Sequence, residues 1–91
     1  MRLDDALFNW LQIKLVAAGR PGDRAAEDTV AFFEQILTED HGLESFEIQT
    51  VDDTMVHVAY TKDGKRKTQL YDREAAEQLL ADINANPKYN E

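Results

Sequence analysis

The sequence predicts an α+β domain of order α-α-β-β-β-α, with a three-stranded antiparallel meander and helices packed on one face. The expectation rests on the spacing of apolar residues, which is helical over residues 1–41, alternates with a period of two over 44–71, and is helical again over 72–86. We therefore expect a single domain over residues 1–91, built from a helical hairpin, a β-meander and a C-terminal helix in those three ranges.

The first helix, expected from Leu3 to Ala18, carries an apolar arc wider than one packed face requires. Either this helix is enclosed within the domain, or part of it meets another subunit. Phe8 and Trp10 lie in the arc and are candidates for such a contact, although aromatic residues at helical spacing usually belong to a core.

Residues that start and stop helices stand at the expected boundaries. Gly19 is suited to ending the first helix, and Asp23 can cap a second helix that runs from about Arg24 to Asp40. Gly42 supplies the backbone freedom that the end of the second helix needs. In the same way Asp72 can cap the final helix, which "NANP" ends.

The strand register is predicted from the requirement that core and surface side chains stay on separate faces. A three-residue loop over 62–64, with Gly64 left-handed in a bulge, meets this requirement better than a two-residue loop at Asp63 and Gly64. The expected pairs are Val56 with Leu70, Val58 with Thr68, Ile48 with Val56, and Phe46 with Val58.

The opposite sheet face is expected to be open and mostly polar. Glu47, His57 and Gln69 should form one row across it, and a carboxylate beside an imidazole is able to act as an acid/base pair. No nucleophile or glycine-rich element is placed to complete an active site, so we expect a structural polar pair and no enzyme activity. The expected residues of this face are Glu47, Gln49, Met55, His57, Thr61, Lys65, Lys67, Gln69 and Tyr71.

Cofactor and metal chemistry lack a motif in this sequence. The stretch "TEDHG" at residues 38–42 groups two acids with His41, but it has neither the alternating oxygen ligands of a calcium loop nor the paired histidines of a zinc helix. The chain has no cysteine, so thiolate ligands and disulfides are excluded. We expect no cofactor.

The composition indicates a cytoplasmic location and no membrane partner. No apolar run approaches the roughly 20 residues of a membrane span. The N-terminus "MRLDDALFNW" places two aspartates where a secretory signal needs a basic start followed by an unbroken apolar stretch.

The net charge of −8 is unevenly distributed. Residues 21–61 carry one basic and ten acidic residues, whereas residues 62–73 carry five basic and two acidic ones, beginning with "KDGKRK". A strongly acidic chain repels nucleic acid as a whole, so the basic stretch is the place where an anionic partner would be expected. The register above places Lys65 and Lys67 on the open face and Arg66 at the rim of the core side.

The order of the last five elements, and the stretch "YDREAAEQLLADI" at residues 71–83, are similar to a double-stranded-RNA-binding domain. The resemblance covers about two thirds of the chain. It implies RNA contacts from the first strand loop and from lysines at the start of the last helix. Here those regions hold acidic residues, which should repel phosphates and argue against a nucleic-acid partner. The positions concerned are Asp52, Asp53, Asp72, Arg73, Glu74 and Glu77.

Two functional hypotheses follow from the sequence. The first is a non-catalytic adaptor or regulator that binds a protein partner or forms a homodimer. The alternative is RNA binding through the basic hairpin, with Tyr71 available for base stacking. The interaction candidates for the two hypotheses are Phe8, Trp10, Glu47, His57, Lys65, Lys67 and Tyr71.

Overall fold

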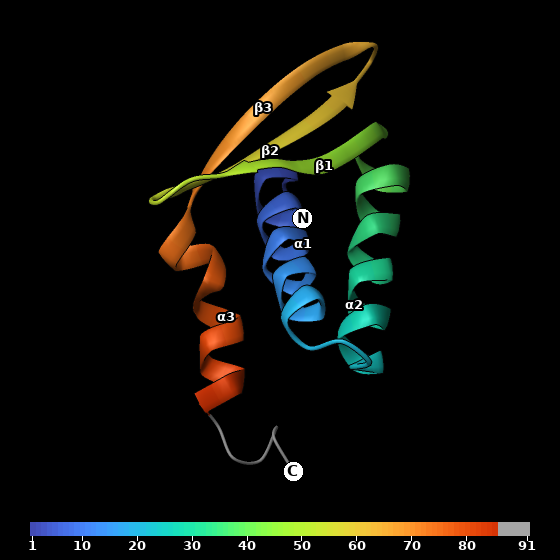
Figure 1. Ribbon diagram of the computed structural model, residues 1–91. Coiled ribbons are helices and arrows are strands. Elements are labelled where there is room, and N and C mark those ends of the chain that lie inside the picture. Colours follow the sequence, from blue (N-terminus) through green and yellow to red (C-terminus); the bar gives the residue numbers. More distant parts are fainter. Residues whose placement is uncertain (86–91) are drawn as a thin grey trace.

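The structure, a computed structural model, describes residues 1–85 and confirms the α+β class and the predicted order of elements (Figure 1). Asn86, the last residue of the expected final helix, lies outside the described residues, as does the end of the "NANP" stretch. The elements are α1 (Leu3–Gly19), α2 (Arg24–Gln35), a π-helical turn η1 (Ile36–Asp40), β1 (Leu43–Val51), β2 (Met55–Lys62), β3 (Lys65–Asp72) and α3 (Arg73–Ala85).

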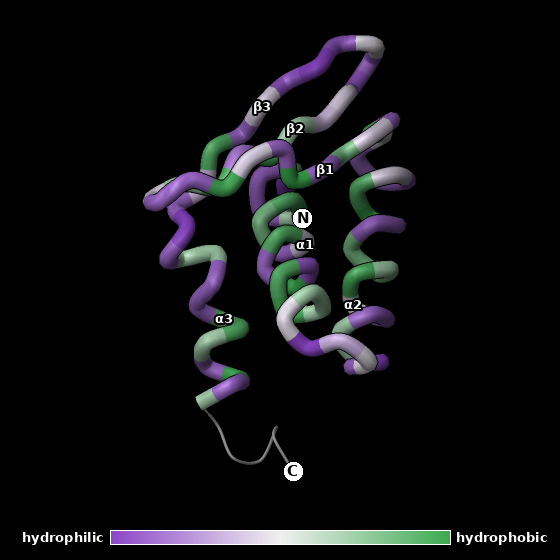
Figure 2. Tube along the Cα trace, viewed as in Figure 1, coloured by the Kyte–Doolittle hydropathy of each residue, from purple (hydrophilic) through white to green (hydrophobic). Residues whose placement is uncertain are grey.

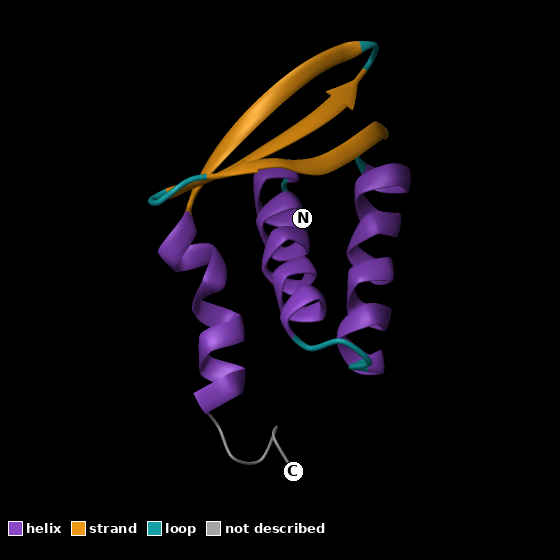
Figure 3. Cartoon of the chain, in the orientation of Figure 1, coloured by secondary structure: helices purple, strands orange, loops and turns teal. Residues whose placement is uncertain are grey.

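The three helices lie on one side of the sheet and leave its other face open (Figure 3). The sheet has the order β1-β2-β3 with both pairs antiparallel, so β1 and β3 are its edges. No helix within residues 1–85 is both long enough and apolar enough to cross a membrane.

Helix α1 lies between α2 and α3, which explains its wide apolar arc (Figure 1). Leu7, Trp10 and Leu11 are almost completely buried, and they share one core with Val56 and Val58 of the central strand. Farther along α1, Gly19 approaches α3 so closely that an added Cβ would lie 2.8 Å from a methyl carbon of Leu80. Of the two possibilities left open by the sequence, enclosure within the fold accounts for the arc.

The predicted helix ends are confirmed by their hydrogen bonds. The Asp23 carboxylate accepts from the backbone N–H of Ala26 at 3.1 Å, and the Asp72 carboxylate accepts from that of Ala75 at 2.8 Å. These bonds satisfy backbone donors that the first turn of a helix leaves without partners. Gly42, with a φ of 67°, ends the segment formed by α2 and η1.

The predicted three-residue loop between β2 and β3 is wrong. The two strands are joined by a two-residue turn at Asp63 and Gly64, whose φ angles of 54° and 75° are both positive. Positive φ at both central residues defines the type I′ turn, whose twist matches that of antiparallel strands, and Asp-Gly is among its preferred sequences. The observed pairs include Val56 with Tyr71, Val58 with Gln69, Tyr60 with Lys67, and Lys62 with Lys65.

The shorter turn exchanges the two faces of β3 relative to the prediction. Tyr71 and Gln69 share the helix side with the buried valines, while Leu70 lies on the open face with 49% of its surface exposed. Lys65 and Lys67 were expected on the open face and instead lie on the helix side. Arg66 was expected on the core side and instead lies on the open face, opposite Thr61.

The predicted register of β1 against β2 is also wrong, by two residues, although the faces of Phe46 and Ile48 are as expected. Phe46 lies opposite Tyr60 and Ile48 opposite Val58. An irregularity between Ile48 and Thr50 then moves Thr50 to the open face, opposite His57. Such a bulge inserts an extra residue into one strand and shifts the side chains that follow it.

Candidate functional site

The open sheet face carries two side-chain pairs, and neither is the expected row of Glu47, His57 and Gln69. His57 Nε2 donates to Asp52 Oδ2 at 2.9 Å, and Arg66 Nη2 donates to Glu47 Oε1 at 2.9 Å. Glu47 lies opposite Ala59 and Arg66 lies opposite Thr61, so their ion pair crosses the central strand. Neither pair could be predicted from the sequence, because both depend on the register of the strands.

Asp52 uses both carboxylate oxygens to hold the β1–β2 turn. Its Oδ1 accepts from the backbone N–H groups of Thr54 and Met55, at 3.0 and 2.6 Å, while Oδ2 faces His57. The bond from His57, followed by the two backbone bonds, lowers the pKa of Asp52 from 3.8 to about 2. This carboxylate is ionised at neutral pH and its hydrogen bonds are local, which describes a structural turn and not an acid catalyst.

Arg73 fastens the same turn to the start of α3. Its Nη1 donates to the Asp52 carbonyl at 3.0 Å, and its Nε donates to both carboxylate oxygens of Glu77, at 3.3 and 3.2 Å. The backbone N–H of Arg73 also donates to the Thr54 carbonyl at 2.8 Å. Arg73 therefore has a structural role in this fold.

Trp10 belongs to the core, and the other two aromatic candidates, Phe8 and Tyr71, are partly buried and pack against it. Tyr71 packs on Phe8, with ring centroids 5.3 Å apart, and its hydroxyl donates to the Asp4 carbonyl at 3.3 Å. Burial, followed by the negative charge of Asp4, raises the pKa of Tyr71 well above its usual value. Trp10 is 2% exposed, and its Nε1 donates to Glu34 Oε2 at 3.1 Å. The ring and hydroxyl contacts of Tyr71 within the fold disfavour the base stacking expected for the RNA alternative, which stays a prediction.

The β2–β3 hairpin gathers three lysines on one face. Lys62 and Lys65 lie directly opposite each other, and Lys67 follows two residues later on the same side of β3. Paired residues of antiparallel strands project from the same face, and so do residues two apart on one strand. We call these residues the lysine face. Figure 2 shows the hydrophilic character of this end of β3.

No amino group of the lysine face takes part in an ion pair or hydrogen bond within residues 1–85. Like charges placed directly opposite each other destabilise a sheet, and no ion pair within residues 1–85 offsets the cost of the Lys62–Lys65 pair. Close to the lysines, Glu44 accepts a hydrogen bond from the backbone N–H of Gly64 at 3.2 Å. The lysine face is therefore a local cationic surface on a chain of net charge −8.

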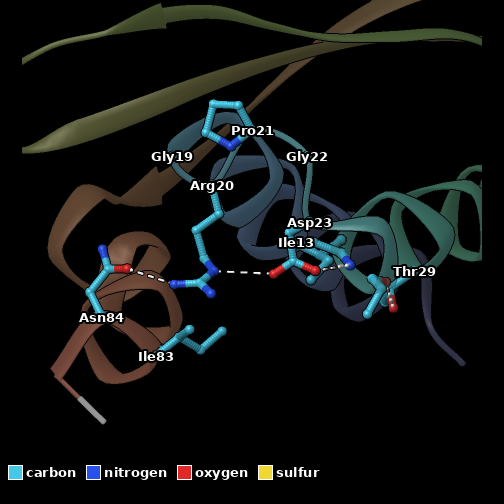
Figure 4. Close-up of a pocket in the computed structure, with 11 residues that line it drawn as sticks. Ile13, Gly19, Arg20, Pro21, Gly22, Asp23, Thr29, Ile83 and Asn84 are labelled. Carbon is cyan, nitrogen blue, oxygen red and sulfur yellow. Dashed lines mark hydrogen bonds and ion pairs between the residues drawn. The ribbon is translucent and has the colours of Figure 1, made fainter. Parts of the chain in front are cut away.

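A second candidate is the open hollow of about 770 Å³ at the end of the helices that lies away from the sheet (Figure 4). Arg20 reaches across it and donates to Asp23 Oδ2 at 3.1 Å and to Asn84 Oδ1 at 3.2 Å. The arginine thus links the α1–α2 connection to α3, and its guanidinium is engaged by the protein itself. The remaining lining is largely apolar or backbone, including Ile13, Pro21 and Ile83.

Metal ligands do not gather anywhere in residues 1–85: no group of three or more His, Asp and Glu side chains is placed to hold an ion. His41 of the "TEDHG" stretch follows η1, and its backbone N–H donates to the Ile36 carbonyl at 3.3 Å. Its Nε2 is buried without a hydrogen-bond partner among the described residues.

Comparison with known proteins adds no relative to this description. No protein-family model, no curated protein and no solved structure matches the chain. Within the chain, the observed register joins Lys62, which the predicted loop had separated, to Lys65 and Lys67 in the lysine face. The Asp-Gly dipeptide between Lys62 and Lys65 was the signal that pointed to it.

Proposed function

We propose that the chain is a non-catalytic protein-interaction module, an adaptor or regulator, that binds an acidic segment of a partner protein through the lysine face. The observation that carries this proposal is the set of three lysines on one side of the hairpin without a carboxylate partner in the described chain. A complementary negative surface would supply the missing counter-charges and steer association.

Nucleic acid is the less favoured anionic partner. Of the five basic residues in 62–73, Arg66 is paired with Glu47 and Arg73 with Glu77, which leaves the three lysines. Tyr71 is partly buried and packs on Phe8. A phosphate backbone extends beyond the hairpin, so the net charge of −8 on the chain would repel it. A short acidic peptide can bind to the hairpin alone and meets less of this repulsion.

The homodimer remains a prediction, but the wide apolar arc of α1 no longer supports it. The wide apolar arc of α1 is covered by α2 and α3 within one chain. Phe32 on α2, 58% exposed, is the largest aromatic surface still open among residues 1–85. Sedimentation at high micromolar concentration, comparing the natural chain with Phe32→Ser, tests whether that surface joins two copies.

The proposed function is tested by affinity capture from native lysate, with and without nuclease. Three baits are compared: the natural chain, a hairpin variant with Lys65→Glu and Lys67→Glu, and a matched control with Lys14→Glu and Arg24→Glu. The control changes the net charge by the same amount at two exposed positions outside the hairpin. We expect a nuclease-resistant protein that the natural chain and the control capture and the hairpin variant does not. Capture by all three baits, or loss on nuclease treatment, would contradict the proposal.

A further inference from the structure

The free edge of β3 offers backbone groups in the same place as the lysine face. The two-residue turn makes Lys62 and Lys65 a hydrogen-bonded pair, and such pairs alternate with non-hydrogen-bonded ones along antiparallel strands. Counting from the turn, the N–H and C=O groups of Arg66, Thr68 and Leu70 point away from β2. The bond from the Arg73 N–H to the Thr54 carbonyl fits the same alternation at the other end of β3.

This edge is regular, whereas the opposite edge of the sheet is not. β3 pairs with β2 from Lys65 to Asp72 without a bulge, and Arg66, Thr68 and Leu70 are all exposed. β1 is irregular at two places, between Leu43 and Ser45 and between Ile48 and Thr50. Bulges protect an edge against pairing with another strand, while a long regular edge is a template for it.

We infer that an extended acidic segment of the partner protein adds to the sheet beside β3, an inference that rests on the proposed function. Its backbone pairs with Arg66, Thr68 and Leu70, and its acidic side chains, spaced two residues apart, meet Lys65 and Lys67 on the helix side. Its intervening side chains lie on the open face beside Leu70, which is 49% exposed. The partner motif is therefore an alternation of acidic and apolar or β-branched residues.

Charge disfavours a second copy that pairs through its own β3, and the two irregularities of β1 disfavour one that pairs through β1. β3 carries three basic residues and one acidic residue, so pairing β3 with another β3 brings two cationic strands together. An acidic strand reverses the sign of that interaction. Lysines on an edge also discourage unselective pairing with neutral strands, which makes the edge selective for an acidic partner.

The test uses a fluorescent peptide of alternating Glu and Val residues, as long as the 8 residues of β3. A peptide with Lys in place of Glu is the control probe, and single-stranded oligouridylate of equal charge is the nucleic-acid arm. Binding is followed by fluorescence anisotropy at low and at physiological salt. We expect the acidic peptide to bind, and the variant Lys65→Glu with Lys67→Glu to weaken it by about tenfold or more. The variant Lys14→Glu with Arg24→Glu should leave binding almost unchanged.

The edge itself is tested by Thr68→Pro, which removes an outward-pointing N–H, against Thr68→Ala, which keeps it. Proline is tolerated on an edge strand where the lost N–H is not part of the ladder, and circular dichroism checks that the fold persists. We expect the proline variant alone to lose binding. Amide hydrogen exchange on the natural chain gives a second measurement that needs no variant: the Arg66, Thr68 and Leu70 amides should exchange more slowly in the complex.

The outcomes separate the two proposals. If the lysine variant loses the peptide while Thr68→Pro binds normally and the three amides exchange at unchanged rates, strand addition is overturned and the proposed function stands. If the acidic peptide fails to bind, or oligouridylate binds as tightly with the same dependence on Lys65 and Lys67, both are overturned. If sedimentation shows the peptide displaced by self-association through β3, a second copy is the occupant and the inference is wrong.

Discussion

His57 Nε2 lies 2.9 Å from Asp52 Oδ2, and this contact spans the turn between β1 and β2. The other oxygen of the same carboxylate accepts from the N–H groups of Thr54 and Met55. The two oxygens thus have separable tasks, since one shapes the turn and the other meets the imidazole. An amide at position 52 retains the first task and loses the negative charge.

Replacing Asp52 by Asn should reduce the loss of the free energy of unfolding as the pH falls below about 4. The folded state lowers the pKa of Asp52 to about 2 from 3.8, so its contribution is present above 3.8 and is lost as the pH falls through about 2. The natural chain should therefore lose more stability than the Asn variant between pH 4 and pH 2. Urea unfolding at several pH values, followed by circular dichroism, measures the difference. If the two proteins lose the same amount of stability between pH 4 and pH 2, the contact between Asp52 and His57 does not persist in solution.

Replacing Tyr71 by Phe should make the stability of the fold decline less steeply as the pH rises above about 10. Burial and the nearby Asp4 charge raise the pKa of Tyr71 above the usual 10.0, so the neutral phenol is favoured by folding. Its contribution is complete below about pH 10 and declines as the pH rises toward the higher pKa of the folded state. Urea midpoints from pH 8 to 11 should fall less for the Phe variant.

A phenol titration provides the control for the Tyr71 prediction. Absorbance of tyrosinate in the folded natural chain, minus that of the Phe variant, isolates the phenol of Tyr71. A titration midpoint near 10 in that difference would contradict its burial against Phe8 and the bond to the Asp4 carbonyl.

Glu34→Leu should destabilise the fold by about 1 kcal/mol, while Glu34→Gln should cost less. Trp10 is 2% exposed, and Glu34 accepts its indole N–H at 3.1 Å. Leucine leaves that buried donor without a partner, whereas glutamine keeps an acceptor oxygen. Urea unfolding monitored by Trp10 fluorescence measures both variants. Equal stability of the Leu and Gln variants would mean that water replaces the carboxylate.

Helix positions were predictable from the sequence because one strong signal determined each of them. The helical spacing of apolar residues located α1, α2 and α3, and Asp23 and Asp72 marked two starts that their bonds to Ala26 and Ala75 confirm. Strand register was not predictable in the same way. Leu70 and Tyr71 are adjacent, and either is apolar enough to face a core, so alternation alone did not choose between them.

Which of Leu70 and Tyr71 faces the helices is determined by the two-residue turn and by contacts with residues distant in the sequence. Tyr71 is amphipathic: its ring packs on Phe8 and its hydroxyl reaches the Asp4 carbonyl, 67 residues away along the chain. No sequence pattern near Tyr71 indicates that the Asp4 carbonyl accepts its hydrogen bond. The predicted three-residue loop placed Lys62 outside the strands, apart from Lys65 and Lys67. With the observed register, Lys62, Lys65 and Lys67 lie together.

Asp63 is therefore the position at which the register can be tested directly. Its φ of 54° lies in the left-handed region, which Asn and Gly adopt readily and β-branched residues avoid. Asp63→Asn should leave the fold as stable as before, while Asp63→Val should cost about 1–2 kcal/mol. Nuclear Overhauser contacts between the α-protons of Thr61 and Arg66 should persist in the Asn variant, because these residues form a non-hydrogen-bonded pair. Tolerance of valine, together with contacts that pair Val58 with Thr68, would restore the three-residue loop and separate the lysine face.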